Sequence, residues 1–93
     1  IIVDIAESIL VDGFRRLLIL NGHGGNTDTM RIALRRLQPT YPDRILAGAS
    51  YWDLCEQEWE RLATGPRKAM GHACEFETAM MMHLRPELVR VEK

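Results

Sequence analysis

The first twelve residues place polar and apolar side chains on opposite faces of a helix. The polar stripe comprises Asp4, Glu7, Ser8 and Asp12, and the apolar stripe Ile2, Ile5, Ala6, Ile9 and Leu10. This pattern predicts an amphipathic helix over residues 1–12. We expect Gly13 to end it, because glycine readily adopts the left-handed backbone found at helix C-termini.

A continuous apolar run follows at 17–20 and leads into a glycine-rich loop at 21–26. A run this short and apolar predicts a strand buried on both faces, as in a parallel sheet that helices cover. Beyond the loop, helical spacing predicts a second helix over 27–37, with Asn26 or Thr27 as its N-cap. The inner stripe of this helix comprises Met30, Ala33, Leu34 and Leu37.

The second half of the chain continues the alternation of strands and helices, which indicates a layered α/β fold with right-handed crossovers. Cys55, Trp59 and Leu62 are spaced to share one face of a helix that Asp53 would cap, which places Trp59 in a core. The predicted elements are a strand over 45–51, a helix over 54–63, a helix over 75–84 that Pro86 ends, and a short strand over 88–91.

Composition narrows the class of protein. The 93 residues are 46% hydrophobic and 27% charged, with a formal net charge of −1, which is typical of a soluble globular domain. A nucleic-acid partner would need a basic face, and solvated surface explains the basic pairs Arg15-Arg16, Arg35-Arg36 and Arg67-Lys68. We therefore expect no nucleic acid and, since no apolar run has the length of a membrane span, no membrane.

Two further features concern the compartment and the extent of the chain. Cys55 and Cys74 are the two cysteines, and their spacing makes no disulfide framework, which favours a reducing compartment and a cytoplasmic localisation. The chain opens at Ile1 without Met and enters a helical pattern at once. We expect residues upstream of Ile1, so that 1–93 would be a single partial domain.

The loop NGHGGN at 21–26 lies at a strand end, where α/β sheets bind ligands. Phosphate binding at the helix N-terminus is disfavoured, because the spacing matches neither the Rossmann nor the P-loop pattern. A structural glycine turn is a common alternative. A metal site is the third interpretation, since the imidazole of His23 is a good ligand and glycines such as Gly24 let a ligand approach closely. That interpretation requires a partner elsewhere in the chain.

The stretch GHACEFE at 71–77 supplies such a partner, because it combines an imidazole, a thiol and two carboxylates. Acid enrichment at a helix N-terminus explains Glu75 and Glu77 but not His72, since a cation is disfavoured there. His72 and Glu75 would share a face if both were helical. Glu75 and Glu77 would point in different directions, and we expect one of them to reach a site while the other bonds locally.

Three other side chains have candidate roles. Cys74 is interpreted as a small packing residue rather than a ligand or nucleophile. His83, in the last turn of its helix, is interpreted as structural, because a cation is favourable there. Trp52 follows a strand end and is a candidate for the lining of a substrate pocket.

The two clusters together resemble the creatininase (creatinine amidohydrolase) family. The resemblance covers most of the chain, and its strongest parts are NGHGGN at 21–26 and GHACEFETAMMMHLRP at 71–86. The stretch 45–53, with its Tyr51-Trp52 pair, fits more loosely. The first motif alone is moderately specific, whereas both motifs in this order are highly specific.

The resemblance implies a three-layer α/β/α fold with a mostly parallel sheet, of which this chain is the C-terminal portion. It implies a homo-oligomer, often a hexamer, that hydrolyses a C–N amide bond of a small or cyclic amide with two divalent metal ions (zinc, manganese or iron). His23 matches the family's histidine metal ligand, His72 its catalytic histidine, and Glu77 a glutamate that supports catalysis. Gly24 and Trp52 are the expected substrate-binding residues.

The chain departs from the family's pattern beside His23. Creatininase itself has an aromatic residue and a metal-binding glutamate at the positions of Gly24 and Gly25. Relatives with the double glycine carry a glutamate at the position of Glu75, and we hypothesise that Glu75 is the replacement metal ligand. The family's remaining ligands, a Glu-x-His pair and an Asp, lie in the N-terminal half, and this chain contains no Glu-x-His.

The implied mechanism uses a water whose pKa the metal lowers to about 7, with His72 as proton donor to the departing nitrogen. Three alternatives stay open. The chain could belong to a catalytically silent family member. It could be a metal-free nucleotide-binding α/β module that uses the glycine loop. It could also be a fragment that is stable only beside its missing half.

Overall fold

The computed structural model describes residues 1–66 and 71–92, which form parts of two compact units. The N-terminal unit is Ile1–Leu54 and the C-terminal unit is Cys55–Lys93. The basic pair Arg67-Lys68 lies outside the described residues. Within the described ranges, no helix has the length and apolar character that crossing a membrane requires.

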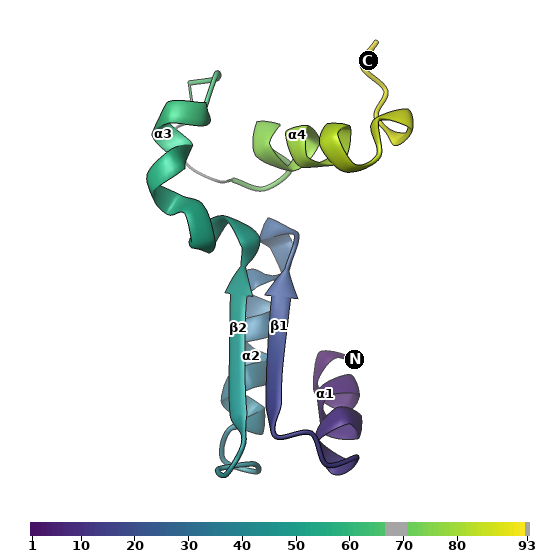
Figure 1. Ribbon diagram of the computed structural model, residues 1–93, viewed down its shortest axis with the longest axis vertical. Coiled ribbons are helices and arrows are strands. Elements are labelled where there is room, and N and C mark those ends of the chain that lie inside the picture. The colour runs from purple at the N-terminus through teal and green to yellow at the C-terminus, as the bar shows by residue number, and fades with distance from the viewer. Residues whose placement is uncertain (67–70, 93) are drawn as a thin grey trace. The chain divides into compact units, whose positions relative to one another are not determined.

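The N-terminal unit is a β-α-β arrangement preceded by a helix (Figure 1). The two strands are parallel and pair in register from Arg16 opposite Ile45 to Asn21 opposite Ser50. The predicted α/β class with a parallel sheet is thereby confirmed, and all four predicted elements match within one residue at each end. They are α1 (Ile2–Val11), β1 (Arg16–Asn21), α2 (Thr27–Leu37) and β2 (Ile45–Ser50), with a short 3₁₀ helix η1 (Gly24–Asn26) before α2.

The core of this unit lies between its helices and one face of the sheet. Three of the four residues in the predicted inner stripe of α2 are buried, namely Met30, Ala33 and Leu37, and the fourth, Leu34, is half-buried. Ala6 and Leu10 of α1, the helix that packs against α2, are buried as well. Gly48 of β2 allows the close approach of α2, because a Cβ atom there would lie 2.6 Å from Leu34 Cδ1. Gly13, with a φ of 99°, follows α1 as predicted.

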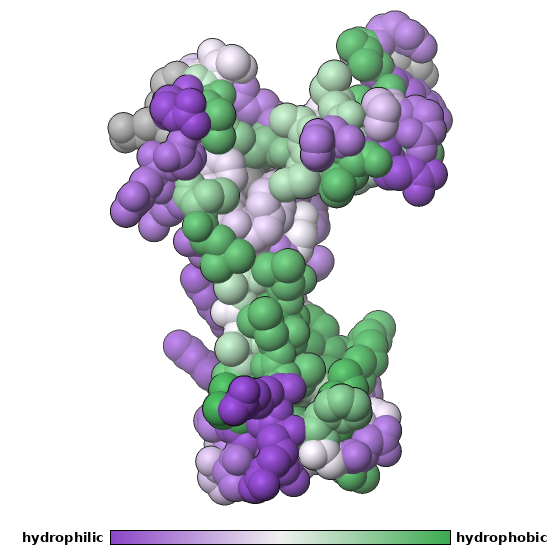
Figure 2. All heavy atoms as spheres, viewed as in Figure 1, coloured by the Kyte–Doolittle hydropathy of each residue, from purple (hydrophilic) through white to green (hydrophobic). Residues whose placement is uncertain are grey.

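On the opposite face of the sheet the apolar side chains are largely exposed among the described residues, so the prediction that β1 is buried on both faces is wrong for this part of the chain. Leu18, Leu20 and Ile45 are about three-fifths exposed, at 64%, 58% and 61%, and Figure 2 shows the hydrophobic surface over β1 and β2. The physical reason is that α1 and α2 both cover the face that bears Leu17 and Ile19.

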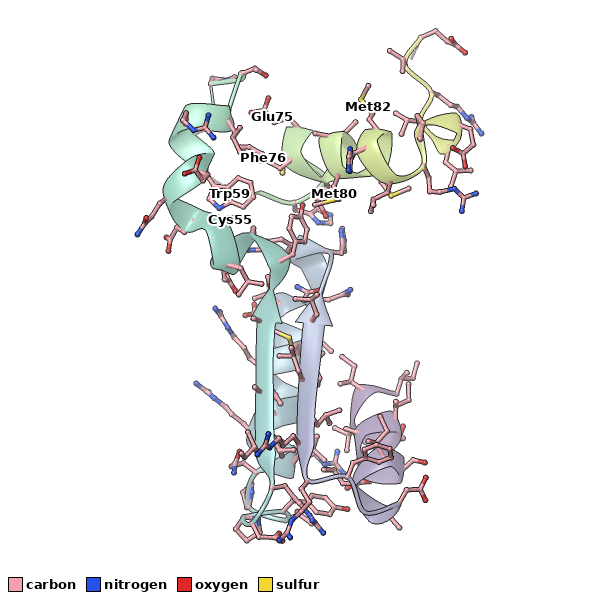
Figure 3. The ribbon with its side chains drawn as sticks, in the orientation of Figure 1. Cys55, Trp59, Glu75, Phe76, Met80 and Met82 are labelled. Carbon is pink, nitrogen blue, oxygen red and sulfur yellow. The ribbon has the colours of Figure 1, made fainter. Side chains whose placement is uncertain are left out.

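The C-terminal unit centres on one aromatic contact. Trp59 packs edge-on against Phe76 with a ring-centroid distance of 4.8 Å (Figure 3), and both residues are buried, which confirms the prediction that Trp59 belongs to a core. The helix predicted over 75–84 is confirmed in both bounds. The helical elements are η2 (Tyr51–Glu58), which begins in the N-terminal unit, then α3 (Trp59–Leu62), α4 (Glu75–Leu84) and η3 (Pro86–Leu88).

The helix predicted over 54–63 is wrong. A 3₁₀ helix begins earlier, at Tyr51, and is interrupted at Cys55, where φ is −139°, so that only α3 remains as α-helix. Asp53 does not cap that helix; its Oδ2 accepts a hydrogen bond from the Ser50 N–H at 3.0 Å and thereby starts the turn upstream. Without one continuous helix, Cys55 and Leu62 are exposed instead of joining Trp59 in the core.

The strand predicted over 88–91 is also wrong. Its first residue belongs to the 3₁₀ helix η3, which Pro86 begins, and the following residues form no strand. Proline at the first position of a helical turn is favourable, since its fixed φ suits the turn and its missing N–H would be unpaired there anyway. Apolar residues alone did not distinguish this turn from a strand.

Candidate functional site

His23 lies directly beyond the carboxyl end of β1, and its backbone is held on both sides. The His23 N–H donates to Asn21 Oδ1 at 3.1 Å, and the His23 carbonyl accepts from the Asn26 N–H at 3.0 Å. The backbone of His23 is extended, with φ −143° and ψ 130°, and His23 is exposed. An imidazole on a fixed backbone at this edge of a parallel sheet fits the predicted role of metal ligand.

A buried polar cluster at the strand ends fixes the loop that carries His23. Asn21 and Ser50 are 5% and 0% exposed, and Asn21 Nδ2 donates to Ser50 Oγ at 3.1 Å. The same Nδ2 donates to Thr27 Oγ1, at the start of α2, at 3.2 Å. Sequence reasoning missed these roles, although a polar residue that closes an apolar strand was a usable indication. We call this pair the Asn21–Ser50 junction.

The two predicted substrate-binding residues follow the ends of the same two strands. Gly24 opens η1 after β1 and is half-buried. Trp52 follows β2, is half-buried, and lies edge-on to Tyr51 with ring centroids 5.0 Å apart. Because β1 and β2 are adjacent and parallel, His23, Gly24 and Trp52 all belong to one edge of the sheet. Asn26 occupies the predicted N-cap position of α2 without a capping bond from its side chain.

His72 lies in the turn before α4 and is exposed. It is not helical, so the condition under which it would share a helix face with Glu75 is not met. The following Ala73 has a φ of 49°, a left-handed conformation that is unfavourable for a residue with a Cβ atom. His72 and Glu75 nevertheless line one hollow of about 350 Å³, together with Gly65, Pro66, Ala73, Cys74 and Phe76.

The two glutamates of α4 point to different partners, and both bond locally. Glu77 accepts a hydrogen bond from the Cys74 N–H at 3.2 Å as part of a capping box. Glu75 accepts from Thr64 Oγ1 at 2.7 Å and from the Gly65 N–H at 3.1 and 3.2 Å. Glu75 is the one that also lines the hollow beside His72.

Cys74 is the N-cap residue of α4 and is partly exposed. Burial raises the pKa of its thiol, but hydrogen bonds from the backbone N–H groups of Gly71, Glu77 and Phe76 outweigh burial and set that pKa below its ordinary value. Cys74 is therefore more than a packing residue, because its sulfur also accepts hydrogen bonds from backbone N–H groups at the start of α4. His83 is in the last turn of α4, as predicted.

The candidate residues are divided between the two units. His23, Gly24 and Trp52 belong to the N-terminal unit, and His72, Glu75 and Glu77 to the C-terminal unit. In residues 1–66 and 71–92, no three His, Cys, Asp or Glu side chains gather in a way that could hold a metal ion. The two Glu75 oxygens accept from the Thr64 hydroxyl and share the Gly65 N–H.

Comparison with known proteins identifies relatives over most of the chain. Mycofactocin precursor peptide peptidase of Mycobacterium ulcerans (strain Agy99) is 33% identical over 78 residues, which cover 84% of this chain and 25% of that protein. Creatinine amidohydrolase of Pseudomonas putida is 30% identical over 99 residues, which cover 97% of this chain and 38% of that protein.

A crystal structure of a protein from Bacteroides fragilis NCTC 9343 matches this chain with a TM-score of 0.69 and 39% identity. That protein has been assigned as a creatinine amidohydrolase. The match covers 96% of this chain and 33% of that one, so the chain spans between 25% and 38% of the length of these relatives. The family model described as "Creatininase: Creatinine amidohydrolase" matches residues 1–93. The chain therefore belongs to the creatininase family.

Proposed function

We propose that the protein to which this segment belongs is a metal-dependent hydrolase of C–N amide bonds. The observation that carries the proposal is the family match over all 93 residues, together with an exposed His23 on a fixed backbone at the carboxyl edge of the sheet. That edge is where α/β sheets bind ligands and perform chemistry. The expected cofactor is a pair of divalent cations, zinc, manganese or iron, whose N/O ligands suit several metals.

Each candidate residue has a distinct role in this proposal. His23 and Glu75 would hold metal, which supplies an acidified water and polarises the amide carbonyl when bound. His72 would donate a proton to the departing amide nitrogen, a step in which histidine is the most common general acid. Glu77 supports this step indirectly, because its bond to the Cys74 N–H fixes the start of α4 beside His72.

The substrate class is an amide of small or cyclic form, or a short peptide-like amide. One relative is named as a peptide peptidase and another as a creatinine amidohydrolase. The first name refers to a C–N bond in a linear substrate and the second to one in a cyclic substrate. The substitution of Gly24 and Gly25 beside His23 removes two side chains that creatininase itself carries, which gives a substrate more room there. Gly24 and Trp52 are the proposed substrate contacts.

Assembly and localisation are part of the proposal as well. We expect a homo-oligomer, a hexamer by resemblance to the family, that acts on small molecules and binds neither nucleic acid nor membrane. A reducing, cytoplasmic compartment suits the two cysteines, Cys55 and Cys74, whose spacing makes no disulfide framework.

The test is elemental analysis of the full-length protein, purified without chelator, beside its His23→Ala and Glu75→Gln variants. We expect about two metal ions per chain in the unmodified protein, by the two-metal logic of such hydrolases, and fewer in both variants. Two metals retained in Glu75→Gln would reject Glu75 as a ligand. No metal in the unmodified protein, after supplementation with zinc, manganese and iron, would instead indicate a catalytically silent member of the family.

A further inference from the structure

We propose that Asn21 is a positioning residue that holds His23 in the geometry for metal binding. The inference rests on the proposed function of His23 as a ligand, but it starts from an independent observation. A single buried side chain, 5% exposed, bonds three separate segments of the N-terminal unit: the loop at His23, the start of α2 at Thr27, and the end of β2 at Ser50.

The orientation of the Asn21 amide follows from its partners. The His23 N–H can only donate, so the group 3.1 Å from it must be the Asn21 oxygen. The amide nitrogen then faces two hydroxyls, Ser50 Oγ at 3.1 Å and Thr27 Oγ1 at 3.2 Å. Both N–H donors of the amide can therefore be used at once, and the side chain has one preferred arrangement.

The consequence for His23 is local and mechanical. A side-chain oxygen that accepts from the N–H two residues later forms an Asx-turn, which sets the direction of the backbone at His23. Burial of the Asn21 amide strengthens this hold, because a buried polar group that loses its partners costs more than an exposed one. Groups that orient a metal ligand without touching the metal typically change metal affinity by about 10- to 100-fold when removed.

Ser50 supports the same arrangement from the neighbouring strand. It is fully buried at 0% exposure, and it is the register partner of Asn21 across the sheet. Its own N–H donates to Asp53 Oδ2, so the turn that carries Tyr51 and Trp52 begins at this residue. The Asn21–Ser50 junction therefore joins the His23 loop to the segment with the proposed substrate contact.

The experiment uses the full-length protein, stripped of metal, in five forms: unmodified, Asn21→Ala, Ser50→Ala, His23→Ala and the control Ser8→Ala. Ser8 is an exposed serine of α1, away from the strand ends in sequence. Zinc affinity is measured by competition with a chelating dye. Backbone amide exchange over residues 21–26 is measured separately on the metal-free proteins.

We expect Asn21→Ala to weaken zinc binding by roughly 10- to 100-fold and to accelerate exchange of the His23 amide. Ser50→Ala should change both readouts less, since the bond from His23 to Asn21 remains, and Ser8→Ala should change neither. If Asn21→Ala binds zinc as tightly as the unmodified protein while His23→Ala has lost zinc binding, the inference is overturned and the proposed function stands.

The exchange measurement separates the two ideas. If His23→Ala binds zinc normally, the proposed ligand role fails, and the positioning inference is judged on the His23 amide alone: unchanged exchange in Asn21→Ala overturns it. If Asn21→Ala does not fold by circular dichroism, Ser50→Ala decides, and unchanged values for both its zinc affinity and its loop exchange overturn the inference.

Discussion

The segments that carry the two candidate site histidines, His23 and His72, are held in contrasting ways. His23 follows a strand, and a buried amide at the ends of two paired strands fixes its backbone. His72 precedes a helix, and the turn around it is held by carboxylates: Glu77 bonds the Cys74 N–H, and Glu75 bonds Thr64 and the Gly65 N–H. The first arrangement uses neutral, buried groups, and the second uses charged, partly exposed ones.

In the proposed function, this contrast matches a division of roles between the two segments. A ligand must keep its geometry, and buried neutral hydrogen bonds in a sheet provide that rigidity. A group that exchanges protons needs access to solvent and substrate, which an exposed turn provides. The two carboxylates near His72 divide these roles: Glu77 accepts from the Cys74 N–H at the start of α4, and Glu75, which lines the hollow, accepts from Thr64 and from the Gly65 N–H.

The largest effect that we expect from a test of this comparison is a loss of catalytic turnover. We expect His72→Ala in the full-length protein to lower turnover by about 10²- to 10⁴-fold, the usual contribution of a general acid, with little change in fold because His72 is exposed. His83→Ala, in the last turn of α4, is the matched control and should keep its turnover. Near-normal turnover of amides by His72→Ala would falsify its proposed role.

A smaller effect tests how tightly each unit is packed. In the N-terminal unit, Gly48→Ala would place a Cβ atom 2.6 Å from Leu34 Cδ1 and 2.9 Å from Met30 Sδ, and we expect a loss of about 1–3 kcal/mol in the free energy of unfolding from overpacking. In the C-terminal unit, the Cβ of Gly65→Ala would lie 3.4 Å from the Glu75 carboxylate oxygens, an ordinary contact. We expect Gly65→Ala to change the free energy of unfolding by no more than about 1 kcal/mol. Urea unfolding of both variants measures the difference, and equal losses would contradict it.

The smallest effect concerns the capping box of α4. Glu77→Ala removes the acceptor for the Cys74 N–H, and we expect it to cost about 0.5–2 kcal/mol in the free energy of unfolding, as for other capping contacts. Glu77→Gln keeps an oxygen acceptor and should lose less. Thermal unfolding of the two variants separates them, and equal stability would show that the hydrogen bond contributes nothing to the helix.

Most of the secondary structure was predictable, and the misses have a common cause. α1, β1, α2, β2 and α4 followed from hydrophobic periodicity, which reports which side chains must leave water. The helix expected over 54–63 and the strand expected over 88–91 failed because short apolar stretches do not specify a period. Local bonds decided them instead: Asp53 started a 3₁₀ turn at Ser50, and Pro86 began η3.

The candidate site was predictable as a set of residues but not as a set of contacts. Imidazole and carboxylate groups in two motifs identified His23, His72, Glu75 and Glu77 from their chemistry, and those four roles stay predictions. Nothing in the spacing along the chain pointed to Ser50, because its partner Asn21 lies 29 residues away and meets it through strand pairing.

The sequence by itself determined the α/β class, the elements that bear each motif, and membership of the creatininase family, since these depend on local periodicity and on residue type. Tertiary structure alone decided that the junction of Asn21 and Ser50 holds the His23 loop, that Glu75 bonds a turn eleven residues before it, and that Leu18 and Leu20 of β1 are exposed. The physical reason is that burial and hydrogen-bond partners depend on which segments the folded chain brings together, and sequence separation does not encode that distance.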